Sequence, residues 1–119
     1  MRGDVVLVDS EGLVDSERLH AAGLRVSHVR DVAAAAERVS ESAADVVVVS
    51  APLESESLQQ LRQRADDATS IIIVGRDDAD RDFARRSGAD SFLLVTADVL
   101  YEIHRALILR RSGRRLRWT

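Results

Sequence analysis

Two residue types are missing from this chain: among its 119 residues there is no cysteine and no lysine. The absence of cysteine excludes a disulfide framework and any thiolate metal site. All 17 basic residues are therefore arginines. No apolar run approaches the roughly 18–20 residues that a membrane helix needs, and the N-terminus lacks a signal-peptide pattern. We therefore expect a cytoplasmic protein that makes no contact with a membrane.

The charges that are present are distributed unevenly. The formal net charge is −3, but residues 105–119 hold six arginines and no acid, which leaves residues 1–104 with a net charge of −9. The length suits one domain with a single core. We expect a folded domain over residues 1–111 and an arginine-rich tail over residues 112–119.

The valine run at 46–49 is the strongest structural signal. Its residues are β-branched and show no polar alternation, which is typical of a strand covered on both faces in the middle of a parallel sheet. In such sheets the residue beyond the carboxyl end of a strand points into the ligand crevice. Here that residue is Ser50, a hydroxyl rather than an evident catalytic group.

Four further short apolar segments alternate with segments of helical spacing. We predict strands over 5–8, 25–29, 46–49, 71–74 and 92–95. We predict helices over 16–22, from Asp31, over about 56–65, over about 78–86, and from Asp98. Alternation of this kind indicates right-handed crossovers and one doubly wound parallel α/β sheet.

Three of these segments resemble the receiver domain of bacterial response regulators. They are VVLVD at 5–9, AGLRV at 22–26 with the alanines that follow Asp31, and GADSFL at 88–93, which matches a G-A-D-x-[YF]-[LI] pattern. The resemblance covers roughly residues 4–111. It implies the CheY-like, flavodoxin-like (βα)5 fold with strand order 2-1-3-4-5.

The resemblance also implies a set of positions for phosphoryl transfer. Receivers bind Mg²⁺ with an acidic pair and an acceptor Asp, and a Thr or Ser and a Lys contact the phosphoryl oxygens. Only the first acid is kept. The corresponding positions in this chain are, in order, Asp9, Ser10, Ser50, Gly75 and Val95. We therefore expect a pseudo-receiver without aspartyl phosphorylation, enzymatic activity, cofactor or bound metal.

Some alternatives for the residues at the carboxyl ends of the strands stay open. Asp9 can be a metal ligand together with Glu11, Asp77 or Asp78, or it can accept backbone N–H groups at the end of its strand, which we favour. For Ser50 we favour a loop-capping role over catalysis. Phe92 matches the aromatic that changes rotamer in switching receivers. Without a hydroxyl partner at Gly75, we expect it to be fixed, either in the core or half-buried.

The resemblance also implies a protein-binding face formed by the fourth helix, fifth strand and fifth helix. Its mixed charges and apolar positions favour a homodimer contact. The residues that we place on it are Asp82, Arg85, Arg86, Asp90, Tyr101, Glu102 and Arg105.

The arginine-rich tail has three interpretations: a linker to an output domain beyond Thr119, such as a DNA-binding domain, an arm that contacts nucleic acid, or a segment that packs on its own acidic domain. We favour the linker. Our main hypothesis for the whole chain is a phosphorylation-independent regulatory module that acts by protein contact. It would regulate a transcription factor or another signalling output. A small-molecule-binding domain that uses the crevice is the alternative, and a conventional phosphotransfer role comes third.

Overall fold

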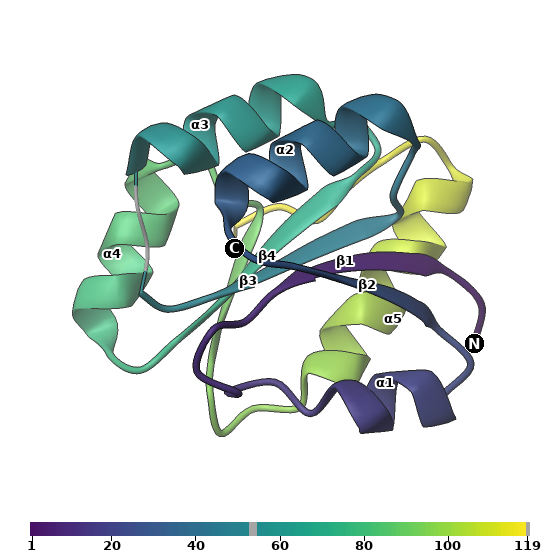
Figure 1. The fold of residues 1–119 in the computed structure, drawn as a ribbon, viewed down its shortest axis with the longest axis horizontal. Coiled ribbons are helices and arrows are strands. Elements are labelled where there is room, and N and C mark those ends of the chain that lie inside the picture. The colour runs from purple at the N-terminus through teal and green to yellow at the C-terminus, as the bar shows by residue number, and fades with distance from the viewer. Residues whose placement is uncertain (53–54, 119) are drawn as a thin grey trace.

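The structure is a computed structural model that describes residues 1–52 and 55–118. Leu53 and Glu54, in the loop expected after the third strand, and Thr119 lie outside the described residues. Strands and helices alternate along the rest of the chain (Figure 1). In chain order they are β1 (Asp4–Val8), α1 (Ser16–Ala21), β2 (Arg25–Val29), α2 (Val32–Glu41), β3 (Val46–Ser50), α3 (Ser55–Arg64), β4 (Ser70–Gly75), α4 (Asp78–Arg86), β5 (Ser91–Leu94) and α5 (Val99–Arg111).

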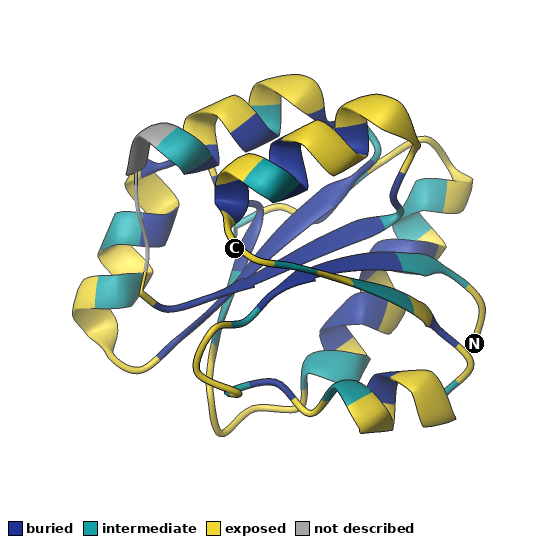
Figure 2. Ribbon diagram, viewed as in Figure 1, coloured by how far each residue is buried: buried dark blue, intermediate teal, exposed yellow. Residues whose placement is uncertain are grey.

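The strands form one parallel sheet in the order β2-β1-β3-β4-β5, which confirms the predicted topology. The valine run is central as expected: Val47 pairs with Val6 of β1 on one side and with Ile71 of β4 on the other. Every residue of β3 and β4 is buried, whereas edge strand β2 is partly exposed (Figure 2). The last strand ends at Leu94, so Val95, expected within it, begins the following loop.

The two faces of the sheet carry separate cores. Val6 and Val8 face a cluster formed with α2, α3 and α4, while Val5 and Leu7 face a cluster formed with α1 and α5. This division follows from the two-residue period of a strand, which sends successive side chains to opposite faces. Figure 1 shows the corresponding layers, with α1 and α5 on one side of the sheet. Within the described residues, no helix has the length and apolar character to cross a bilayer.

Aspartates begin most of the helices. Asp15, Asp31, Asp77 and Asp98 each accept a hydrogen bond from a backbone N–H in the first turn of the helix that follows. Such caps satisfy amide groups that have no partner within the helix. The caps predicted at Asp31 and Asp98 are confirmed.

The segment after α5 packs on the domain. Leu116 is only 2% exposed and belongs to the core cluster on the α1–α5 face, and its N–H donates to Ser70 Oγ at 2.9 Å. The Trp118 indole N–H donates to the Ala89 carbonyl, and the ring packs against the cluster on the other face. The folded unit therefore extends past residue 111 to at least Trp118. This packing agrees with the third interpretation of the tail, while the linker and the nucleic-acid arm stay predictions.

An arginine near the end of α5 fixes that helix to two loops. Arg110 Nε lies 2.6 Å from Asp45 Oδ1, and Nη2 lies 2.9 Å from Asp66 Oδ2. The hydrogen bond from Arg110 is the main cause that lowers the pKa of Asp66 to about 2. Because this value is below that of an unfolded aspartate, the pairing stabilises the native state above roughly pH 4, and its contribution is lost as the pH falls toward 2.

The docked tail makes the stability of the domain depend on Leu116. We expect Leu116→Ala to lower the free energy of unfolding by about 2–5 kcal/mol, because it leaves a cavity in the core. Leu94→Ala, at a leucine that is 45% exposed, is the matched control and should cost about 0.5 kcal/mol. Urea denaturation followed by circular dichroism measures both. Equal, small effects would mean that the tail is not part of the folded unit.

Candidate functional site

Asp9 and Ser50 meet at the carboxyl edge of the sheet, where neighbouring strands β1 and β3 end. Ser50 is buried, and its hydroxyl donates to Asp9 Oδ1 at 2.7 Å and lies 3.2 Å from the Val8 carbonyl oxygen. The backbone N–H of Leu13 donates to Asp9 Oδ1 at 2.9 Å, and that of Val14 donates to Oδ2 at 2.8 Å. Both residues therefore have the capping roles favoured from the sequence: together they fix the loop between β1 and α1.

The other acids at this edge are also engaged within the chain. Glu11 forms an ion pair with Arg76 at 2.9 Å, and Asp77 Oδ1 accepts from the N–H of Asp80 at the start of α4. Ser10 and Asp78 are exposed. Within the described part of the chain, no group of three or more His, Cys, Asp or Glu side chains is placed to hold a metal ion.

This donor set does not fit the Mg²⁺ that the receiver fold implies. Mg²⁺ requires near-octahedral oxygen ligands and is usually held by carboxylates. At the five mapped positions the chain offers one carboxylate, Asp9, both oxygens of which already accept hydrogen bonds. Gly75 and Val95 have no side-chain oxygen. The alternative in which Asp9 joins Glu11 or Asp77 on a metal is therefore not supported by the geometry.

Phe92 fills the space beside Gly75. A Cβ added to Gly75 would lie 2.5 Å from Phe92 Cε1 and 2.7 Å from the Cβ of Asp80. The ring is half-buried and packs against the core cluster beneath α4, as predicted for an aromatic without a hydroxyl partner. The inward position of the Phe92 ring therefore requires a glycine at position 75.

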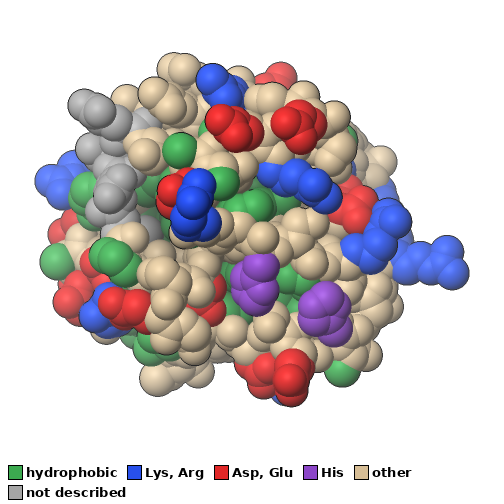
Figure 3. Space-filling model, in the orientation of Figure 1, with side chains coloured by type: hydrophobic (Ala, Val, Ile, Leu, Met, Phe, Trp, Pro, Cys, Tyr) green, Lys and Arg blue, Asp and Glu red, His purple; other side chains and the backbone are tan. Residues whose placement is uncertain are grey.

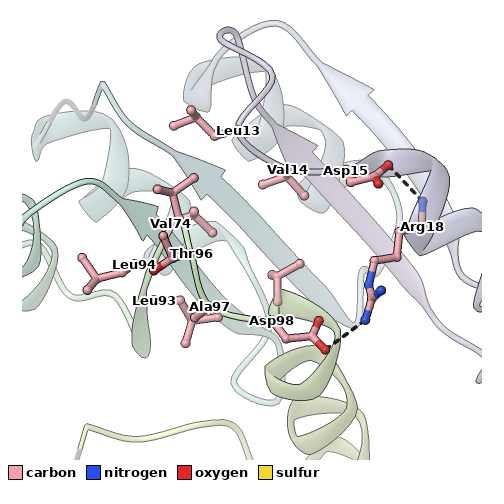
Figure 4. A pocket seen from close by; sticks show the side chains of 12 residues that line it. Leu13, Val14, Asp15, Arg18, Val74, Leu93, Leu94, Thr96, Ala97 and Asp98 are labelled. Atoms are coloured by element: carbon pink, nitrogen blue, oxygen red, sulfur yellow. Dashed lines mark hydrogen bonds and ion pairs between the residues drawn. The ribbon is translucent and has the colours of Figure 1, made fainter.

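A cleft opens beside this site, between the β1–α1 loop and the β5–α5 loop. Its volume is about 370 Å³. Val14 lies on one side and Leu93 and Ala97 on the other (Figure 4), but polar groups make up the larger share of its exposed lining. Arg18 reaches across from α1 to Asp98 at the start of α5, with 3.0 Å between Nη2 and Oδ2. Both side chains are more than half exposed, so the ion pair lies at the rim of the cleft.

The residues expected on a partner surface are divided by the structure. Asp82, Arg85 and Arg86 on α4 and Tyr101 and Arg105 on α5 are exposed.

Asp90 and Glu102 are buried, and placing them on that surface was wrong. Asp90 is 6% exposed and accepts from Arg62 at 2.6 Å, from Arg115 at 2.9 Å and from the N–H of Ile71. Glu102 is 8% exposed and accepts from the Ser91 hydroxyl and from Arg105. A buried carboxylate is retained where such donors compensate its charge, so both residues serve the fold.

Two features were not found from the sequence. Ile108 is 49% exposed and follows Tyr101 by seven positions on α5, which places both on one face; the heptad spacing of Tyr101 and Ile108 was the available signal. The Arg18–Asp98 pair spans 80 positions, and no local pattern predicts it.

Several solved structures have the same fold. A receiver domain of the sensor histidine kinase PA1611 from Pseudomonas aeruginosa PAO1, with magnesium coordinated in its active-site cleft, superposes with a TM-score of 0.77 at 16% identity, over 90% of this chain and 98% of that one. A CheY-like receiver domain protein from Methanospirillum hungatei JF-1 gives a TM-score of 0.74 at 15% identity, over 94% and 97%. The chain has the fold of a response-regulator receiver domain.

A third neighbour of this receiver fold is a LuxR family DNA-binding response regulator from Silicibacter pomeroyi. It has a TM-score of 0.67 at 24% identity, over 94% of this chain and 93% of that one. No protein-family profile matches the sequence, and no curated protein matches it. At these identities the likeness establishes the fold and leaves the chemistry to the residues described above.

The contact between Gly75 and Phe92 is testable. We expect Gly75→Ala to lower the free energy of unfolding by about 1–3 kcal/mol, because the added methyl overpacks the site. Phe92→Leu in the same chain should recover part of that loss, since the smaller side chain makes room, and a double-mutant cycle measures the coupling. Additive effects of the two substitutions would contradict this packing.

Proposed function

We propose that this receiver-fold domain regulates by protein–protein contact, without aspartyl phosphorylation and without catalysing a reaction. The observation that supports this most strongly is Asp9, whose carboxylate already accepts three hydrogen bonds at the carboxyl edge of the sheet. Phosphoryl transfer to a carboxylate needs a free attacking oxygen and cations that neutralise the developing charge. The residues at Ser50, Gly75 and Val95 supply neither.

The outer face of α5 is the proposed contact surface. Tyr101 is 68% exposed and Ile108 is 49% exposed, and exposed Arg105 lies between them on the same face. Asp82 and Arg86 add charges of both signs on α4, which contacts β5 from the opposite face of the sheet. Aromatic and apolar positions within a charged rim are typical of protein interfaces. A homodimer through the α4–β5–α5 face is the simplest assembly of this kind.

The proposed output is a transcription factor or another signalling protein. One similar structure is a DNA-binding response regulator, and a DNA-binding domain joined beyond Thr119 is consistent with that likeness. The docked tail would then place such a domain beside α4 and the start of β5, because Trp118 is bonded to Ala89.

Sedimentation velocity over a concentration series tests the contact surface. We expect a reversible dimer whose dissociation constant is unchanged by Mg²⁺ and acetyl phosphate. Tyr101→Asp should weaken the dimer tenfold or more, because it places a charge at an aromatic anchor, whereas Tyr101→Phe should keep it. Tyr101 is exposed, so neither change should affect folding.

Two results would oppose the proposal. A monomer at every concentration would remove the homodimer and direct the search to a different protein partner. A dimer that forms only with acetyl phosphate would reinstate phosphorylation control.

A second candidate function is binding of a small molecule with both polar and apolar groups in the cleft between the β1–α1 and β5–α5 loops. The cleft volume of about 370 Å³ lies in the range of small-molecule sites, and the carboxyl edge of the strands is where such folds bind ligands. A fragment screen by thermal shift tests it, because a ligand that binds only the native state raises the melting temperature. A true ligand should lose its effect in Ala97→Trp, which fills the cleft, and keep it in Ala33→Trp on α2.

A further inference from the structure

The tail crosses the amino edge of the sheet, opposite the edge that carries Asp9 and Ser50. Leu116 bonds to Ser70 at the start of β4, Arg115 bonds to Asp90 just before β5, and Trp118 bonds to Ala89 after α4. These anchors hold the backbone of residues 114–118 in one place. The backbone of the exposed arginines in this segment, Arg114 and Arg117, is therefore fixed.

A hollow of about 570 Å³ lies between this tail and the C-terminal end of α4. Four arginines line it: Arg85, Arg114, Arg115 and Arg117. The acids among the described lining residues are Asp67 and Asp90. Asp90 is already occupied by Arg62 and Arg115, so positive charge is in excess.

Three of these arginines form no ion pair with the acidic side chains that the structure describes. Within the described residues, no acidic oxygen lies within 4 Å of a guanidinium nitrogen of Arg85, Arg114 or Arg117. On the face shown in Figure 3, by contrast, acidic and basic side chains are interspersed. Like charges held together without counter-charges create a field that attracts an anion.

A second hollow, of about 310 Å³, lies on the other side of the same arginines. It is lined by Arg105 and Leu109 of α5 and shares Arg114, Arg115, Arg117 and Trp118 with the first. The tail arginines therefore form a ridge between the two hollows, and Arg105 in the second hollow is paired with Glu102. An extended anion with several charged groups can contact more of these arginines at once than a single small ion can.

We propose that this ridge binds the phosphate groups of a nucleic-acid backbone, without reading its sequence. Arginine guanidinium groups form bidentate, charge-assisted hydrogen bonds with phosphate. Base stacking is not available, because Arg85 lies 5.9 Å over the Trp118 ring, the ring packs on the core and its N–H bonds to Ala89. The fixed backbone reduces the ordering cost of binding.

The binding is weak and strongly dependent on salt, because residues 1–104 carry a net charge of −9 and oppose a polyanion. Arg105 borders both this site and the proposed dimer surface, but Tyr101 and Ile108, the apolar anchors of the dimer, line neither hollow. Failure of one proposal therefore leaves the other intact.

Trp118 is the single tryptophan of the chain and lies within the site, so its emission reports occupancy. We expect saturable changes in that emission, and in the anisotropy of a fluorescein-labelled oligothymidylate, when the two are mixed at low salt. The double variant Arg114→Gln, Arg117→Gln should lower the slope of log affinity against log salt by about 1.4, as expected for two phosphate contacts on a single strand. Arg30→Gln, at the opposite edge of the sheet, is the matched control and should bind as the parent does.

Competitors separate the possible sources of the anion. Inorganic pyrophosphate that saturates the site as tightly as the oligonucleotide would overturn the nucleic-acid assignment in favour of free phosphates. Polyglutamate that competes equally would overturn phosphate recognition. The absence of binding at low salt, or a slope unchanged in the double variant, would also overturn the proposal.

Discussion

The carboxyl edge of this domain depends on the three hydrogen bonds that end at Asp9. They tie the β1–α1 loop to the end of β3 through Leu13, Val14 and Ser50. A carboxylate used in this way stabilises a loop but has little capacity left for a cation or a phosphoryl group. The hydroxyl at Ser50 matters as much as the carboxylate, since a second acid there would repel Asp9 instead of donating to it. One acid and one hydroxyl thus form a structural contact at the edge where receiver folds place their chemistry.

The opposite edge of the sheet is held by arginines. Asp90 accepts from Arg62 and Arg115, and Arg110 bridges Asp45 and Asp66. Burial lowers the pKa of Arg62, and the charge of Asp90 opposes that shift. These pairs connect α3, α5 and the tail to the strand starts, so the acidic domain and its basic end are parts of one folded unit. Part of the uneven charge of the sequence is thus used in specific contacts, and exposed arginines such as Arg114 and Arg117 are in no ion pair with the described residues.

The fold was predictable because its signals are local. The valine run, the alternation of strands with helices, and the segment at 88–93 each depend on neighbouring residues, and Asp31 and Asp98 cap helices where expected. Long-range contacts were not predictable. Asp90 stands in a polar turn and was expected on the surface. It is buried instead, and it accepts hydrogen bonds from Arg62 and Arg115, 28 and 25 positions away. Leu116 stands among arginines, as in a linker, but its side chain packs in a core cluster and its N–H donates to Ser70, 46 positions away. Phe92 fits beside Gly75 because glycine has no side chain to occupy that space. No local sequence pattern shows that these two residues are in contact.

The most direct test of this account is whether the carboxyl edge binds Mg²⁺ together with beryllofluoride, a mimic of the phosphoryl group on aspartate. The measurement is a titration followed by two-dimensional ¹H–¹⁵N NMR of the uniformly labelled protein. If Asp9 is committed to its three donors, the amide signals of Leu13, Val14, Ser50 and Gly75 should show no saturable shift. Saturable shifts at Ser50 and Gly75 would show that the edge still holds a phosphoryl-type ligand, and would contradict the account.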